Sequence, residues 1–362
     1  MRNFRCQCGA TVFFENTRCI SCSRKLGFLP DRSVMSALEP AGENLWRAPL
    51  AGMSALYRSC ANTGQGEVCN WMVPRFDAHP FCTSCRLNQI IPNLDAPQNR
   101  LYWKRIEAAK RRLVYSLLRL GLPIIDRQQD PAHGLAFNFL ADQPDSGEFS
   151  DSLDPSCRVM TGHVDGVITI NVAEADDVER ERIRMQMNEN YRTLLGHVSH
   201  EIAHYYWPLL VRDTGRLDAF RDLFGDETAD YAAALDAYYE HGAPPGWQTR
   251  YVSAYASAHP WEDWAESFAH YLHMTDTLEA AADAGILPGM SDVAALPRDV
   301  EALMNRWREF AVVLNSLNRC MGLPDAYPFV LSGKADEKIA FVHAAIRPIA
   351  QPLTPSRIAA DA

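Results

Sequence analysis

The sequence predicts an α+β chain that is mostly helical, in which small four-cysteine modules precede a larger domain. Eight of the ten cysteines lie before residue 86. Most of the remaining chain shows the apolar periodicity of helices, and only two short segments have the alternation of strands. With 362 residues and 47% hydrophobic content, the chain is long enough for roughly two to three domains. We place a cysteine-rich region at 1–95 and a second domain at 96–362.

The cysteines form two groups with the spacing of zinc ligands. One group lies at about 4–26 and the other at about 57–88, each with closely spaced pairs that can wrap a tetrahedral ion. The first comprises Cys6, Cys8, Cys19 and Cys22, and the second Cys60, Cys69, Cys82 and Cys85. Interleaved pairing of the eight thiols is an alternative that spacing leaves open. We expect Cys157 and Cys320, which stand alone, to be small buried apolar residues.

The start of the chain and its charge limit where the protein works and what it binds. The first residues lack the apolar run of a secretory signal, and no stretch approaches the ~20 apolar residues of a membrane span. We therefore expect a cytoplasmic protein that enters no membrane and whose thiols bind zinc rather than form disulfides. Through residue 95 the ten Lys and Arg exceed the seven Asp and Glu by three, and two tetrathiolate zinc centres would bring this region to about −1.

That balance is not the charge of a phosphate-binding surface, so we expect no nucleic-acid binding. The simpler expectation is that the modules dock on the second domain or recruit a protein partner. The whole chain carries a formal net charge of −10, which indicates an acidic surface.

Between the cysteines and the centre of the chain we expect a linker, one helix and two strands. Residues 90–97 contain two prolines and read as the linker. Residues 99–120 form a basic amphipathic helix, whose charges we expect on a solvated face, with a docking surface as the alternative. Residues 134–140 and 166–172 have the pattern of strands. We expect the second of them to be a sheet edge that offers its backbone to an extended peptide.

The next segment, 179–207, predicts one long helix with Gly196 as its only possible break and Pro208 as its stop. It contains His200, Glu201 and His204 in the order H-E-x-x-H. Four residues along a helix give about 400° of rotation and about 6 Å of rise, so the histidines share one face and can bind one metal ion. Glu201 lies beside them, placed to take a proton from water on the metal. The alternative is a helix that merely carries these three residues.

A catalytic zinc site needs a third protein ligand. The metzincin pattern would require Gly at 207 and His at 210, and this chain has Trp207 and Leu210, so that class is excluded. The other common solution is a carboxylate on a later helix. Pro260 suits the first turn of such a helix, and Glu262 and Glu266 then lie one turn apart on one face.

We assign Glu262 as the third ligand and Glu266 as the acceptor that holds a ligand histidine in its tautomer. An exchange of roles among Glu262, Asp263 and Glu266 is an alternative, and so is a solvated acidic face. The bulky apolar neighbours Trp264 and Phe268 argue for a buried helix, in which carboxylates need partners.

Around this segment we expect two further helices, at 217–239 and 301–317, and a rigid turn at 242–246. The polar tail at 353–362 is expected to be frayed.

These motifs resemble the bacterial family of zinc-binding metallopeptidases that carry an N-terminal zinc ribbon. The likeness covers nearly the whole chain and includes F-R-C-Q-C-G at 4–9, T-G-H at 161–163, I-T-I-N at 168–171, A-E-A-D-D at 173–177, Y-R-T-L-L-G-H at 191–197, H-E-I-A-H-Y-Y-W at 200–207, L-F-G-D-E at 223–227, H-P-W-E-D-W-A-E-S-F-A-H at 259–270 and N-R-C-M-G-L-P at 318–324. The resemblance implies a zincin-like domain of the gluzincin arrangement, with His, His and Glu as zinc ligands. Where the family usually has Gly in the motif, this chain has Ala203, which leaves the ligand spacing intact.

The resemblance also implies a role for Tyr255, seven residues before Glu262. In similar gluzincins a tyrosine near this position donates a hydrogen bond to the developing oxyanion, a contribution of a few kcal/mol. His259 is a second candidate for that role. A tyrosine packed in the core with its hydroxyl satisfied locally is the alternative.

We therefore expect a zinc-dependent metallopeptidase with one catalytic and two structural zinc ions, acting on a peptide or protein. Two other functions stay open: a zinc amidase acting on a small or non-peptide amide, and a non-catalytic zinc scaffold that recruits a protein partner. Glu201 argues against the scaffold, because a structural site needs no general base.

Overall fold

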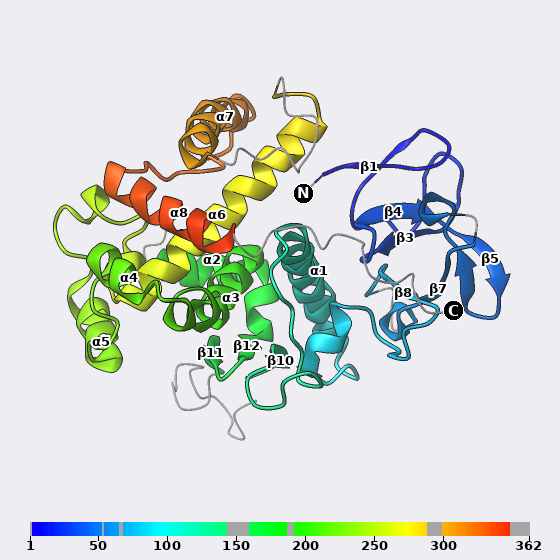
Figure 1. The fold of residues 1–362 in the computed structure, drawn as a ribbon, viewed down its shortest axis with the longest axis horizontal. Coiled ribbons are helices and arrows are strands. Elements are labelled where there is room, and N and C mark those ends of the chain that lie inside the picture. Colours follow the sequence, from blue (N-terminus) through cyan, green and yellow to red (C-terminus); the bar gives the residue numbers. More distant parts are fainter. Residues whose placement is uncertain are drawn as a thin grey trace.

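The computed structural model describes residues 2–52, 54–64, 68–142, 159–186, 192–287 and 299–347. In Figure 1 the strand-rich N-terminal part and the helical C-terminal part lie on either side of the long helix α1, Pro97–Arg119. The predicted class, α+β and mostly helical with cysteine-rich modules first, is confirmed.

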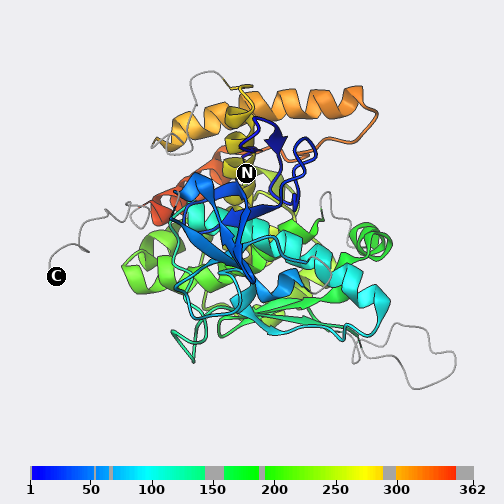
Figure 2. The ribbon, with the colours of Figure 1, turned by 90° about the vertical axis from the view of Figure 1, so that its right-hand side faces the viewer.

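Short antiparallel strands build the N-terminal part. Two pairs and one four-stranded antiparallel sheet, ordered β5-β6-β7-β8, are present in the described residues. The strands are β1 Phe4–Arg5, β2 Thr11–Val12, β3 Leu26–Leu29, β4 Val34–Ala37, β5 Glu39–Gly42, β6 Leu45–Arg47, β7 Leu56–Ser59 and β8 Met72–Pro74. Figure 2 shows these strands in front of α1, and Phe14 and Phe28 pack edge-on against Tyr115 of α1, with ring centroids 5.3 and 5.8 Å apart. The cysteine-rich region is therefore packed onto the rest of the molecule.

The second part contains a four-stranded sheet ordered β11-β12-β10-β9. Its strands are β9 Asn88–Ile90, β10 Ala136–Leu140, β11 Gly162–Val164 and β12 Val167–Asn171. β10 runs parallel to both neighbours, and β11 pairs antiparallel with β12. β9 precedes the expected linker, so the cysteine-rich region contributes one strand to this sheet. The strand 166–172 was expected at the edge, but β12 is internal and β11 is the edge strand next to α3, Leu194–Leu210.

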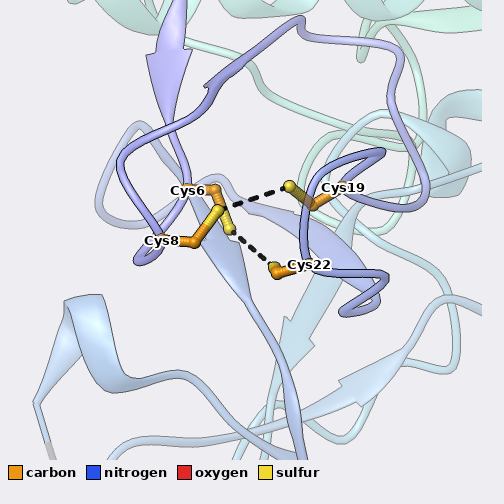
Figure 3. A group of neighbouring side chains, drawn as sticks. All are labelled: Cys6, Cys8, Cys19 and Cys22. Atoms are coloured by element: carbon orange, nitrogen blue, oxygen red, sulfur yellow. Dashed lines mark hydrogen bonds between the residues drawn. The ribbon is translucent and has the colours of Figure 1, made fainter.

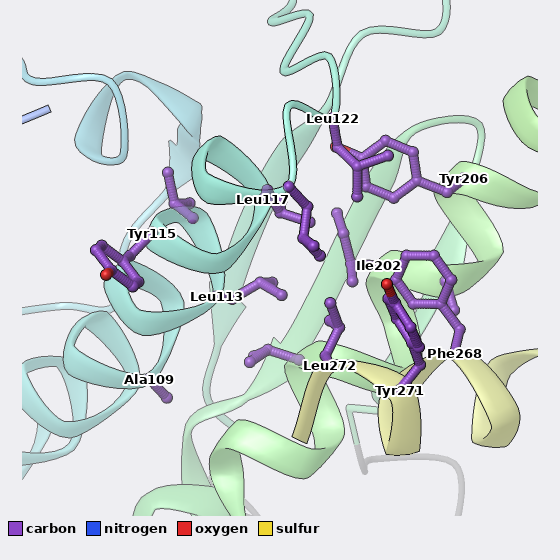
Figure 4. Packing of buried hydrophobic residues seen from close by; sticks show 14 of the residues in the cluster. Ala109, Leu113, Tyr115, Leu117, Leu122, Ile202, Tyr206, Phe268, Tyr271 and Leu272 are labelled. Carbon is purple, nitrogen blue, oxygen red and sulfur yellow. The ribbon is translucent and has the colours of Figure 1, made fainter. Parts of the chain in front are cut away.

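The remainder of the C-terminal part is helical, and its other helices lie around α3 and α6. They are α2 Asp177–Gln186, α4 Leu217–Phe224, α5 Tyr231–His241, α6 Pro260–Asp283, α7 Val300–Cys320 and α8 Gly333–Ile346. Side chains from α1, α3 and α6 meet in the core, with Leu117, Ile202 and Leu272 among them (Figure 4). Each such side chain contributes about 1.5–3 kcal/mol on full burial, which fixes α3 against α6. No helix among the described residues is both long enough and apolar enough to cross a bilayer.

Two predicted helices are wrong in their extent. The segment 179–207 forms two helices, α2 and α3, because Thr193 is extended and its hydroxyl accepts the Gly196 amide at 2.9 Å as an N-cap. α3 then continues past Pro208, where the lost backbone bond falls within the last turn. The segment 217–239 is also two helices, because Gly225 ends α4 with φ 107° and Asp230 caps α5. The helix expected at 301–317 is α7.

Two further expectations on burial are wrong. Cys320 is exposed at the end of α7, not buried. The charges of α1 are not all solvated, since Glu107, Lys110 and Arg111 are buried. Cys157 and the tail 353–362 lie outside the described residues.

Candidate metal centre

The helices α3 and α6 bring the H-E-x-x-H residues together with Glu262. Val198, Ile202 and Tyr206 form a fully buried stripe on α3, so the other side of the helix carries His200 and His204. The Trp264 indole of α6 donates to the Ala203 carbonyl at 2.8 Å, which fixes the two helices in register.

The three side chains converge closely enough to share one ion. His200 Nε2 lies 3.2 Å from His204 Nε2 and 2.9 Å from Glu262 Oε2. His204 Nε2 lies 3.6 Å from Glu262 Oε1. Ligand atoms ~2.0–2.2 Å from a tetrahedral zinc ion are separated by about 3.3–3.6 Å, so the observed spacing is within a few tenths of an ångström of that of a shared ion. Glu262 Oε2 is also buried and accepts no hydrogen bond in the described structure, which suits an atom that binds a cation.

Glu266 fixes the orientation of His200 from behind. Its Oε1 lies 2.8 Å from His200 Nδ1, and its Oε2 accepts from the Ser253 hydroxyl at 2.6 Å. A proton on Nδ1 leaves the Nε2 lone pair pointing at the convergence point. Burial raises the pKa of Glu266, but the hydrogen bond with His200 outweighs burial and brings this pKa to about 2. Burial also raises the pKa of Glu262, but the neighbouring His200 and His204 and the bond from Tyr231 outweigh burial and bring this pKa to about 2.

Glu201 differs from these two carboxylates. No hydrogen bond of its side chain is present among the described residues, and burial raises its pKa to about 7, with His200 opposing. A carboxyl group with a pKa near the working pH can both take and return a proton.

Tyr255 and His259 have different environments. The ring of Tyr255 lies 5.9 Å from that of His200, and burial raises the pKa of its phenol well above the usual value, so the hydroxyl keeps its proton. His259 is the N-cap of α6: Nδ1 accepts the Trp261 amide at 3.1 Å, and Nε2 lies 3.2 Å from the Ala229 carbonyl. Both ring nitrogens of His259 are therefore engaged with backbone, and the expected oxyanion role of His259 is not supported.

Two residues near the centre were not identified from the sequence. Tyr231 is the first residue of α5, and its hydroxyl donates to Glu262 Oε1 at a distance of 2.8 Å. The His163 ring of β11 lies parallel to that of His204, with centroids 6.5 Å apart, and its Nε2 accepts the Gly166 amide at 3.1 Å. The sequence did not mark Tyr231 as a site residue, because the segment 217–239 was predicted as one helix and Tyr231 fell in its interior.

The eight N-terminal thiols gather as two separate groups of four. Figure 3 shows the first group, in which Cys6 and Cys22 sulfurs are 3.6 Å apart and those of Cys8 and Cys19 are 3.7 Å apart. In the second group the sulfurs of Cys69 and Cys82 are 3.7 Å apart. Zinc–sulfur bonds of ~2.3 Å in a tetrahedron predict about 3.8 Å, whereas a disulfide requires ~2.0 Å. The groups have the dimensions of zinc sites and are not interleaved.

Buried charges of α1 surround the second group. Cys85 Sγ lies 3.9 Å from Glu107 Oε2, and Lys110 Nζ is 2.8 Å from Glu107 Oε1. Arg111 donates to the Val68 carbonyl at 2.5 Å. These contacts explain why this face of α1 is charged yet not solvated: the cations face the thiols and Glu107.

Comparisons with known proteins agree with this arrangement. Residues 99–345 match the family model described as "Putative zinc-binding metallo-peptidase", and residues 3–96 match a zinc-ribbon domain. Proteins from Mycobacterium tuberculosis and Mycobacterium bovis, each described as uncharacterized, are 40% identical over 361 residues, covering 98% of both chains. No solved structure gives a significant match.

Proposed function

This chain belongs to the zinc-binding metallo-peptidase family, and from that premise we propose that it hydrolyses peptide bonds at the centre formed by His200, His204 and Glu262. The convergence of these three side chains, with Glu266 behind His200, is the observation that supports the proposal. A zinc ion held by these three residues would polarise the carbonyl of the substrate and lower the pKa of a bound water to ~7.

The surrounding residues handle the protons. Glu201 is the general base: it takes a proton from the attacking water and passes it to the leaving amine. Its raised pKa, about 7, matches both roles. Tyr255 keeps its phenolic proton and donates a hydrogen bond to the oxygen that gains negative charge.

The edge strand β11 is the proposed binding surface for the substrate. Among the described residues it pairs with β12 alone, and it contacts α3, which carries the motif. An extended peptide can add to its open side as a further strand, with its backbone held beside the metal centre. We also propose that the two thiol groups hold structural zinc ions.

The first test is the zinc content of the full-length protein. The wild type should contain about three zinc ions per chain, as three four-coordinate sites require, and the variant His200→Ala/His204→Ala about two. Two ions in both proteins would leave the thiol sites standing and contradict a catalytic zinc centre.

The second test addresses chemistry. Glu201→Gln should keep all its zinc while kcat on a peptide library falls by at least ~10²-fold, the usual contribution of a general base. Unchanged turnover would remove Glu201 as the base. Cleavage of small amides but not of peptides would favour an amidase.

A further inference from the structure

The hydroxyl of Tyr231 reaches the proposed metal centre from outside the two helices that build it. Tyr231 is the first residue of α5, and it donates to Glu262 Oε1 at 2.8 Å. None of the residues of α5 is fully buried, so core packing of the helix does not account for this contact. It joins an exposed helix to a carboxylate whose side chain is 1% exposed.

The two oxygens of Glu262 are thereby made unequal. Oε2 lies 2.9 Å from His200 Nε2 and accepts no hydrogen bond within the described residues. Oε1 lies 3.6 Å from His204 Nε2, and it also accepts the bond from Tyr231. Because the phenol occupies Oε1, the carboxylate presents Oε2 to an ion. Partners of this kind orient ligands, and their loss typically costs 10–100-fold in metal affinity.

The turn before Tyr231 is itself held in place. The Asp226 side chain accepts from the Thr228 amide at 2.9 Å, and Asp230 caps α5 by accepting the Ala233 amide at 3.1 Å. His259 Nδ1 accepts a backbone N–H, so Nε2 carries the proton and donates to the Ala229 carbonyl at 3.2 Å. The His259 ring also packs edge-on against the Tyr231 ring, with centroids 5.1 Å apart.

We propose that Tyr231 is a positioning residue that holds Glu262 with a single oxygen toward the metal, and that His259 acts through Tyr231. The inference rests on the proposed metallopeptidase function and adds two residues to it. It gives His259 a role that differs from oxyanion stabilisation, since His259 fixes the segment that presents the phenol.

The test measures metal affinity in the full-length protein. Tyr231→Phe removes one oxygen from a residue that is 36% exposed, so the fold is expected to persist. The matched control is Tyr206→Phe, which removes another phenol bond, to the Pro123 carbonyl at 2.8 Å, on the buried side of α3. Zinc is competed against a chromophoric chelator, and the variant His200→Ala/His204→Ala gives the signal of the thiol sites alone.

We expect zinc at the third site to bind about 10–100-fold more weakly in Tyr231→Phe, with the thiol sites unchanged. The visible spectrum of Co²⁺ bound at that site should shift in the same variant, because the orientation of the carboxylate changes. Tyr206→Phe should match the wild type in both measurements.

A second variant tests the role of His259. Asn is a good N-cap, so His259→Asn keeps the cap of α6 but cannot reach the Ala229 carbonyl. Its affinity loss should be smaller than that of Tyr231→Phe, and the double variant should lose no more than Tyr231→Phe alone. Additive losses would overturn the coupling between the two residues.

Three results would overturn the inference about Tyr231. Unchanged affinity and spectrum in Tyr231→Phe would do so while leaving the proposed function intact. Equal losses in Tyr206→Phe would show a general destabilisation instead. Absence of a third zinc ion in the wild type would remove the proposed function and this inference together.

Discussion

Two glutamates on one face of α6, a single turn apart, have different partners. Glu262 faces both histidine Nε2 atoms and is almost fully buried. Glu266 meets only the Nδ1 side of His200 and is held by the Ser253 hydroxyl. The difference follows from the position of the His200 ring, which lies between the two carboxylates and presents one nitrogen to each.

Substitution of the two glutamates should separate their roles. Glu262→Ala removes an atom that faces the ion, so we expect the third zinc to be lost at micromolar zinc. Glu266→Ala leaves all three facing atoms in place and should weaken binding by about 10–100-fold. Elemental analysis and chelator competition distinguish the two, and the reverse pattern would show that the roles are exchanged.

Glu174 should make folding sensitive to acid. Its carboxylate lies 2.8 Å from Arg192 and 3.3 Å from His197, just ahead of and at the start of α3. Burial raises its pKa, but His197 and Arg192 outweigh burial and bring it to about 2 from an ordinary 4.5. Because the unfolded chain then binds the proton more tightly, the stabilisation is present above pH 4.5 and lost as the pH falls toward 2.

The shift corresponds to ~3 kcal/mol in the free energy of unfolding, since one pKa unit is about 1.4 kcal/mol. Urea unfolding of the wild type and of Glu174→Gln measures it. The variant should be less stable at pH 7, and its difference from the wild type should shrink below pH 4.5 and vanish as the pH falls through about 2. A constant difference at all pH values would contradict the ion-pair explanation.

At the scale of elements, local capping determined where helices begin, and the sequence pattern did not reveal it. The apolar stripe of 179–207 correctly predicted helix on both sides of residues 187–191, and it correctly placed His200 and His204 on one face. It missed the break because Thr193 and Gly196 were read as interior residues, not as a cap. The same applies to Gly225 and Asp230, and the missed break concealed Tyr231.

Thr193→Ala should therefore weaken the start of α3. Loss of the hydroxyl that accepts the Gly196 amide costs about 1 kcal/mol at an N-cap. We expect a lower thermal midpoint with little change at the metal centre, because His200 lies nearly two turns further along the helix. Thr193→Ser, which retains the hydroxyl, should behave like the wild type. Equal losses in both variants would show that the methyl group matters, not the cap.

At the scale of the whole molecule, the sequence predicted the modules but not how they attach. Cysteine spacing was enough to find both groups, since ligand chemistry fixes the spacing locally. The docking depends on long-range contacts, such as Phe14 and Phe28 on Tyr115 and the thiol of Cys85 near Glu107, which no local pattern encodes. Glu262 could be predicted to lie beside the histidines, because the helical periodicity of its segment and the need for a carboxylate ligand pointed to the same residue.

Loss of the second thiol group should affect the entire chain. Cys82→Ser/Cys85→Ser removes two thiols beside the buried Arg111, and because Glu107 remains next to Arg111 the cost should stay below the about 3–5 kcal/mol of an uncompensated buried charge. We expect one zinc ion fewer and a lower midpoint in a single calorimetric transition. The control Cys6→Ser/Cys8→Ser alters the other group, where Cys8 is exposed, and should cost less. Two separate transitions in the first variant would show that the parts unfold independently.

The helix α6 has a consequence for the order in which the molecule is completed during synthesis. Its first turn carries Glu262, and near its end Asp283 accepts the backbone amide of Asn3 at 2.8 Å. The thiol groups leave the ribosome early, but the histidine pair does not meet Glu262, and the Asn3 amide does not meet Asp283, until α6 has emerged. A nascent chain thus holds H-E-x-x-H without its third ligand while the segment from His204 to Glu262 is being made. The N-terminal modules can dock on α1 before that point, whereas the proposed hydrolytic centre is completed only once α6 has emerged, so shorter ribosome-bound fragments lack its third ligand.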